Sequence, residues 1–110
     1  MMDLKKIAAH LDPMCGTPVF LHMEVNPGAY IRNAMVTLER YHVRGQGVYR
    51  IYLQFADQQG ILHMDDVTEA RVEDGRVLFV GYDEMERIAR TLVISSQPLS
   101  MGRNGEKGDA

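Results

Sequence analysis

The chain has 110 residues, which is enough for one domain with a single core and too few for two ordinary ones. Hydrophobic residues make up 45% and charged residues 25%, the balance of a folded globular protein rather than a disordered one. The formal net charge of −3 argues against a dedicated nucleic-acid binder, because such proteins usually carry a strong positive field.

The sequence has few features that bear on where in the cell the protein is located. Cys15 is the single cysteine, so no intrachain disulfide can form and nothing suggests an oxidising compartment. Residues 1–11 lack the continuous apolar core of a signal peptide, and no apolar run is long enough to cross a bilayer. The sequence therefore predicts a cytoplasmic protein without membrane contact.

The first element is a short amphipathic helix over about 4–11. Asp3 is a good N-cap, and it precedes apolar residues at the spacing of one helical face: Leu4, Ile7, Ala8 and Leu11. Pro13 and Gly16 then end the helix.

Strands follow. Residues 19–25 alternate between apolar and polar and close at the turn formed by 26–28. Residues 29–43 hold either one long strand or an irregular piece followed by a strand from about Ala34. Residues 48–55 alternate most cleanly, and we expect their odd-numbered side chains, from Tyr49 to Phe55, to point inward.

The second half of the chain continues the β pattern. Residues 61–64 form a short strand, and 67–72 pairs with 76–80 in a hairpin because Asp74-Gly75 is a strong turn signal. Apolar residues at helical spacing predict a short helical turn near 84–90, which leads into a last strand. Residues 1–98 then form a single β-rich domain, and 99–110 is a disordered tail with almost nothing to bury.

The fold class is therefore mainly β, with α+β as the alternative. We expect five to seven antiparallel strands that close into a small barrel or a curled sheet, with a short N-terminal helix.

One short pattern occurs twice and suggests a metal site. Phe20 to Glu24 and Ile61 to Asp65 both read apolar-Leu-His-Met-acid. Because residues i and i+2 of a strand share a face, each segment offers a histidine and a carboxylate together: His22 with Glu24, and His63 with Asp65. The four would suit zinc or a similar ion if the two strands were neighbours; otherwise they decorate a solvated face.

A basic and aromatic cluster suggests an anion site. If the loop at 45–47 has three residues, one face of the hairpin carries Arg40, His42, Arg44, Arg50 and Tyr52. A loop of two or four residues would turn Arg40 and His42 to the other face and dissolve the patch. The sequence does not decide between these registers.

Protein association is the third possibility. Phe20, Val48 and Ile61 fall on faces assigned to solvent, and exposed apolar residues commonly mark a partner surface. An uncapped edge strand could also pair with a second copy. The alternative is that another part of the fold covers these residues.

No Walker, dinucleotide-binding or zinc-ribbon spacing occurs, and the few serines lie near the tail, so an enzyme is not favoured and no cofactor is indicated. We expect a small non-enzymatic binding or adaptor module, with a protein partner or self-association as a homodimer favoured. The alternatives are a metal-binding protein and a sensor of anions or nucleotides.

Overall fold

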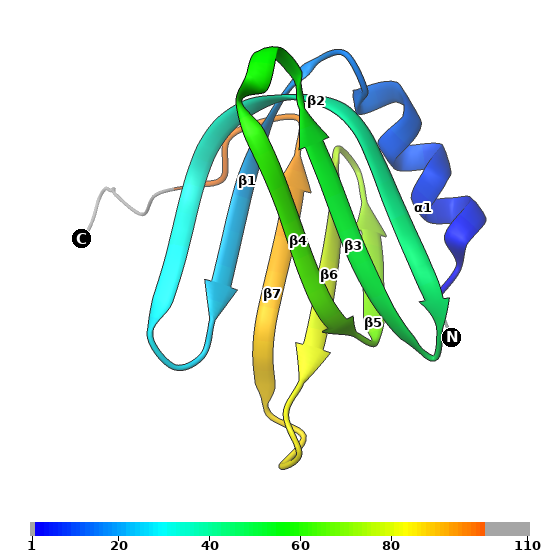
Figure 1. Cartoon of the computed structure of the whole chain (residues 1–110), viewed down its shortest axis with the longest axis vertical. Coiled ribbons are helices and arrows are strands. Elements are labelled where there is room, and N and C mark those ends of the chain that lie inside the picture. The colour runs from blue at the N-terminus through cyan, green and yellow to red at the C-terminus, as the bar shows by residue number, and fades with distance from the viewer. Residues whose placement is uncertain (1, 101–110) are drawn as a thin grey trace.

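Seven antiparallel strands form one curled sheet in the order β4-β3-β2-β1-β7-β6-β5, and a short helix lies beside it (Figure 1). The computed structural model describes residues 2–100. The helix α1 spans Leu4–Leu11, and the strands are β1 Pro18–Val25, β2 Ala29–Gln46, β3 Val48–Phe55, β4 Gly60–Val67, β5 Glu69–Glu73, β6 Arg76–Tyr82 and β7 Ile88–Ser95. Two 3-10 turns occupy Asp12–Met14 and Ala56–Gln58. The predicted class and strand number are confirmed.

The helix forms where the sequence predicted it. The side chain of Asp3 accepts a hydrogen bond from the backbone N–H of Lys6, which satisfies one of the free donors at the helix start. Ile7 and Leu11 are buried, so the apolar stripe packs on the sheet and the polar face stays in solvent. No helix among residues 2–100 is long and apolar enough to cross a membrane.

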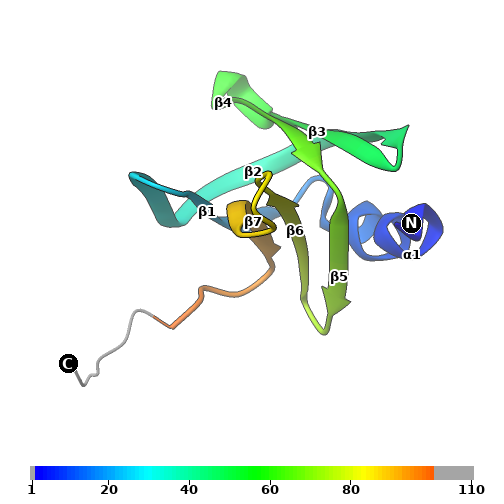
Figure 2. The same ribbon diagram turned by 90° about the horizontal axis from the view of Figure 1, so that it is seen from below.

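The long strand β2 makes the sheet curl. Its first half, up to Thr37, pairs with β1, and its second half, from Leu38, pairs with β3. Leu38 is fully buried where one half passes into the other. Figure 2 shows the result: β3 and β4 form a layer over β1, β7 and β6, and β2 connects the two layers.

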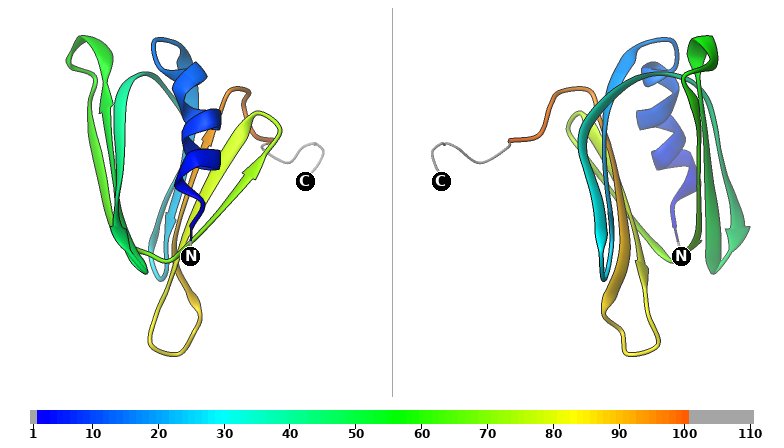
Figure 3. Two further views of the ribbon diagram at one scale, coloured as in Figure 1. Left: turned by 90° about the vertical axis from the view of Figure 1, so that its right-hand side faces the viewer. Right: turned by 60° about the vertical axis from the view of Figure 1, so that its left-hand side comes forward.

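The sheet is curled and does not close into a barrel. Its two edges are β4 and β5, which follow each other in the chain with only Thr68 between them. The two halves of the sheet face each other with the helix beside the opening (Figure 3). The core between them includes Val19, Leu38, Ile51, Leu53, Val67, Val77, Phe79, Leu92 and Ile94.

The inward orientation of β3 agrees with the sequence pattern. Tyr49, Ile51, Leu53 and Phe55 are buried, and the residues between them are exposed or half-buried. The outer side of β3 is therefore free to carry polar side chains.

The predicted helical turn near 84–90 is wrong. Residues 83–87 form the loop of the β6–β7 hairpin, and β7 begins at Ile88. Asp83 accepts hydrogen bonds from the backbone N–H groups of Met85 and Arg87, which fixes a tight turn. The β-branched residues that follow then pair with both β1 and β6, and this pairing outweighs the helical spacing.

The predicted disordered tail lies mostly outside the described residues, since 101–110 are not described. Its first residue, Leu99, is held by Asn33, whose side-chain amide donates to the carbonyl oxygen of Leu99 and accepts from its N–H, both at 2.8 Å.

Candidate functional site

The β2–β3 hairpin has the register that brings the basic residues to one face. Gly45 and Gln46 belong to β2 and pair with Tyr49 and Val48, so the connection is Gly47 alone and not the three residues 45–47. A one-residue and a three-residue connection place the same side chains on the same face, so the predicted grouping of the basic residues forms although the loop is shorter. The next pairs along the hairpin that face outward are Arg44 with Arg50, His42 with Tyr52, and Arg40 with Gln54. These six residues are called the basic face below.

The basic face is an open, shallow surface. Its six residues line a depression of about 450 Å³. Arg40 and Arg50 are 59% and 68% exposed, so the guanidinium groups are accessible to a ligand from solvent.

The charges of the basic face are only partly balanced. Arg44 lies directly opposite Arg50, and like charges at opposed positions destabilise a sheet. Asp65 on β4 lies 3.6 Å from Arg50, and Glu39 lies 3.6 Å from Arg40. Arg44 has no acidic partner within residues 2–100.

Two rings stand beside the arginines. His42 and Tyr52 are cross-strand neighbours, with ring centroids 5.9 Å apart and planes inclined by 25°. This is an offset stack, and it forms an aromatic platform in the middle of the basic face.

The neighbouring strand β4 extends the same surface. His63 pairs with Tyr52, and its Nε2 lies 2.9 Å from Oδ1 of Asp65, as expected for an N–H donated to a carboxylate. Asp65 thereby contacts both His63 and Arg50, so its charge is already shared.

The predicted four-residue metal site does not form. His22 and Glu24 lie on β1, whereas His63 and Asp65 lie on β4, and strands β2 and β3 separate them. Within residues 2–100, no group of three or more His, Cys, Asp or Glu side chains could hold a metal ion. The repeated pattern places each pair on its own part of the outer surface, because the sheet order depends on pairing that a local pattern does not encode.

His22 has a different environment from that of a metal ligand. Its Nδ1 accepts a hydrogen bond from Nε of Arg32 at 3.3 Å, while Glu24 lies 4.0 Å from Nε2. Burial lowers the pKa of His22, the charge of Arg32 lowers it further, and Glu24 opposes both. His22 is therefore occupied by its own neighbours.

The three apolar residues predicted for a partner surface do not form one patch. Val48 and Ile61 are 54% and 63% exposed, but Phe20 is half-buried. They lie on β3, β4 and β1, respectively, at different parts of the sheet.

A larger group of exposed apolar residues lies elsewhere and was not predicted. Ten large hydrophobic residues are exposed among residues 2–100, and six of them lie at the ends of the β1–β2 and β6–β7 hairpins: Val25, Tyr30, Ile31, Tyr82, Met85 and Ile88. Asn26 joins the two ends through hydrogen bonds to the carbonyl oxygens of Ala89 and Ile88. We call these six residues the hairpin-end surface, which covers both faces of the sheet because the consecutive strand residues Tyr30 and Ile31 point to opposite sides. Apolar residues next to two turns were its sequence signal.

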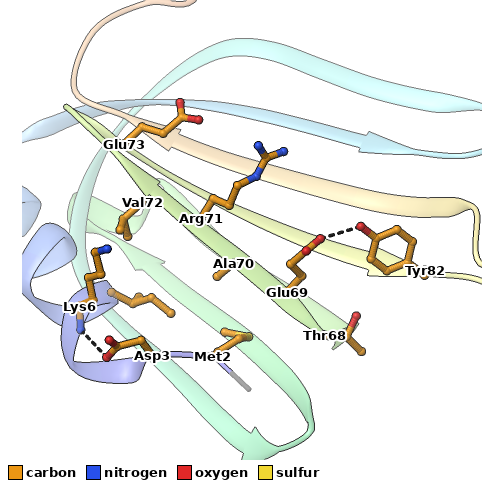
Figure 4. Close-up of a pocket in the computed structure, with 11 residues that line it drawn as sticks. Met2, Asp3, Lys6, Thr68, Glu69, Ala70, Arg71, Val72, Glu73 and Tyr82 are labelled. Atoms are coloured by element: carbon orange, nitrogen blue, oxygen red, sulfur yellow. Dashed lines mark hydrogen bonds between the residues drawn. The ribbon is translucent and has the colours of Figure 1, made fainter.

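A groove of about 710 Å³ runs between the start of α1 and the edge strand β5 (Figure 4). Some of its polar side chains are already engaged. Tyr82 donates a hydrogen bond to Glu69 at 2.6 Å, and the carboxylate of Asp3 is used to cap the helix. The groove carries charges of both signs, whereas the charged residues of the basic face are all basic.

Cys15 is not an activated nucleophile. Burial raises the pKa of its thiol, and the nearby charge of Asp12 raises it further. A raised pKa keeps the thiol protonated at neutral pH, whereas a reactive cysteine needs a lowered one.

Comparisons with known proteins agree with the fold. Residues 1–99 match the family described as "Protein of unknown function (DUF1806)". The chain is similar to "Uncharacterized protein YojF" of Bacillus subtilis (strain 168), with 30% identity over 110 residues that cover 86% of this chain and 93% of the relative. It also resembles the crystal structure of Bacillus subtilis YojF with a TM-score of 0.79 and 30% identity, over 91% of this chain and 95% of that chain. The chain belongs to the DUF1806 family.

Proposed function

We propose that this protein is a small non-enzymatic binding module whose basic face holds an anionic ligand. The observation that carries the proposal is the pair Arg44 and Arg50, which lie opposite each other although, within residues 2–100, only Arg50 of the two has an acidic ion-pair partner. An anion placed between the two guanidinium groups would replace repulsion with charge-assisted hydrogen bonds. Phosphate and carboxylate groups both fit the planar guanidinium donors.

The rest of the basic face supports the same proposal. The arginines project from two paired strands, so their backbone positions are fixed and a ligand needs to order only the side chains. The charge is local, since the whole chain is acidic, and this favours a small ligand over long-range attraction to a polyanion.

The test is an NMR titration of the ¹⁵N-labelled chain with inorganic pyrophosphate. We expect the largest shift changes around Arg44 and Arg50, and Arg44→Gln should weaken binding about tenfold, as for the loss of one charge-assisted contact. Arg71→Gln is the matched control, because Arg71 is an exposed strand residue at the opposite edge of the sheet. Absence of shifts on the basic face, or equal losses in both variants, would count against the proposal.

Protein association is a second candidate, and the hairpin-end surface favours it. Six of the ten large hydrophobic side chains exposed among residues 2–100 lie near these two hairpin ends, and exposed apolar groups commonly mark a surface that meets another protein. Sedimentation velocity over a hundredfold range of concentration tests for a homodimer. We expect Met85→Ser with Ile88→Ser to reduce association, whereas Leu4→Ser, on the exposed side of α1, should not. A monomer throughout the range would remove self-association from consideration.

A further inference from the structure

The basic face is ordered in three rows across β2 and β3. Arg44 and Arg50 form the first row, His42 and Tyr52 the second, and Arg40 and Gln54 the third. Successive rows are two residues apart, which corresponds to about 7 Å along a strand. Cationic, aromatic and amide groups therefore follow one another in a fixed direction.

The first row suits a phosphate group. The opposed guanidinium groups can each donate two hydrogen bonds, and Arg44 has no competing ion pair within residues 2–100. Asp65 lies on the far side of Arg50, on β4, so one flank of the row remains positive.

The second row suits a planar ring. His42 and Tyr52 already stack, and a nucleobase can extend such a stack through its own π face. The distance between the first two rows matches the arrangement of a nucleotide, in which a sugar separates the base from the phosphate.

The third row can read the edge of that ring. The side chain of Gln54 is half-buried and has no hydrogen-bond partner within the described part of the chain. A carboxamide presents a donor and an acceptor side by side, which is the pattern that complements the edge of adenine. Arg40 in the same row is turned to Glu39, which leaves Gln54 as the neutral polar group.

We infer that the ligand of the basic face is a nucleotide, with its phosphate between Arg44 and Arg50, its base on the His42–Tyr52 stack and its base edge at Gln54. This inference rests on the proposed anion site and adds the ligand class and a base-reading residue. The same chemistry occurs in free mononucleotides and in single-stranded nucleic acid.

The experiment compares three probes in NMR titrations of the full chain: inorganic pyrophosphate, the four nucleoside monophosphates, and a four-nucleotide single strand. We expect a nucleoside monophosphate to bind about tenfold more tightly than its phosphate alone, with adenine ranked first. Shifts at residues 52 and 54 should appear with nucleotides and not with pyrophosphate. Tighter binding of the single strand than of its monophosphates would identify nucleic acid as the source of the same ligand chemistry.

Variants separate the inference from the proposed function. Tyr52→Leu should lower nucleotide affinity about tenfold and leave pyrophosphate affinity unchanged, whereas Arg44→Gln should lower both. Gln54→Leu should flatten the ranking of the four bases, and Tyr30→Leu, an exposed tyrosine on the β1–β2 hairpin, serves as the control. Spectra that match the wild type away from the substituted residue and its strand neighbours establish that each variant is folded.

The outcomes are distinct. If pyrophosphate binds as tightly as the nucleotides, the anion site stands and the nucleotide inference fails. If neither binds at the basic face, both fail. A base ranking that Gln54→Leu does not change would remove Gln54 from its assigned role.

Discussion

The backbone of Gly81 lies against the carbonyl oxygen of Asp66, so that a Cβ atom at position 81 would stand 2.3 Å from that oxygen. Arg90 lies at the same point and donates a hydrogen bond from Nη1 to the same carbonyl at 3.1 Å. The contact joins β6 and β7 to the end of β4, which lies at one edge of the sheet. It therefore holds two distant parts of the curled sheet together.

Gly81→Ala should destabilise the fold by about 1–3 kcal/mol, because the added methyl group overlaps a backbone atom that cannot move away alone. Urea unfolding followed by circular dichroism measures the loss. Arg90→Ala in the Gly81→Ala background is the control. It removes the guanidinium clash but leaves the carbonyl in place, so it should restore little stability. If Gly81→Ala unfolded at the same urea concentration as the wild type, the close approach of position 81 to Asp66 would not matter for stability.

Local patterns in the sequence predicted the elements that depend on neighbours in the chain. The cap at Asp3 and the spacing from Leu4 to Leu11 predicted the helix correctly, and the alternation from Tyr49 to Phe55 predicted which side of β3 is buried. The helical spacing after Asp83 wrongly predicted a helical turn, because the pairing of β7 with two strands outweighs the local preference.

Features that depend on distant segments could not be predicted. The glycines at 45 and 47 allowed several hairpin registers, and only the paired strands show that Arg44 meets Arg50. His22 and His63 have the same local pattern but lie on strands separated by two others. Gln54 gave no signal of its own, since its place beside the aromatic pair follows from the register.

The register of the basic face depends on Gly45. Its φ is +135°, and a Cβ atom there would stand 2.2 Å from the carbonyl oxygen of Val48. Gly45→Ala should therefore destabilise the protein by about 2–3 kcal/mol and disturb the pairing of Arg44 with Arg50. Gly47→Ala is the matched control. Gly47 has a φ of +76° with no atom near its Cβ position, so the cost should be about 1 kcal/mol. Urea unfolding gives both values, and equal losses would show that space at Gly45 does not matter.

His22 should make stability depend on pH. Burial and Arg32 lower its pKa in the folded protein below the ordinary value of 6.5, so the unfolded chain binds a proton more readily. Above pH 6.5 both states are neutral and His22 has no effect. As the pH falls below 6.5, stability is lost until the folded pKa is passed.

His22→Gln should therefore lose less free energy of unfolding between pH 7 and pH 5 than the wild type. Arg32→Gln removes the second cause of the lowered pKa and should give an intermediate dependence on pH. Urea unfolding at several pH values measures all three proteins. If the free energy of unfolding fell equally with pH in the wild type and in His22→Gln, another group would control the pH dependence between pH 7 and pH 5.

The turn between β6 and β7 depends on the charge of Asp83. Its carboxylate accepts hydrogen bonds from the backbone N–H groups of Arg87 and Met85 and from the side chain of Arg87. The bond from the backbone of Arg87 is the main cause that lowers the pKa of Asp83 below its usual 3.8. The stabilisation is therefore present above pH 3.8 and is lost as the pH falls through the lower, folded pKa.

Asp83→Asn should unfold at a lower temperature than the wild type at pH 7, because a neutral amide accepts these hydrogen bonds more weakly. The difference should shrink as the pH falls below 3.8, where the wild-type carboxyl also becomes neutral. Glu84→Gln is the matched control, since it removes the same charge from the same turn without those hydrogen bonds, and it should leave the melting temperature nearly unchanged. Thermal melts at pH 7 and pH 3 distinguish the two variants. A gap between Asp83→Asn and wild type that stays constant across this range would show that the ionised carboxylate is not what holds the turn.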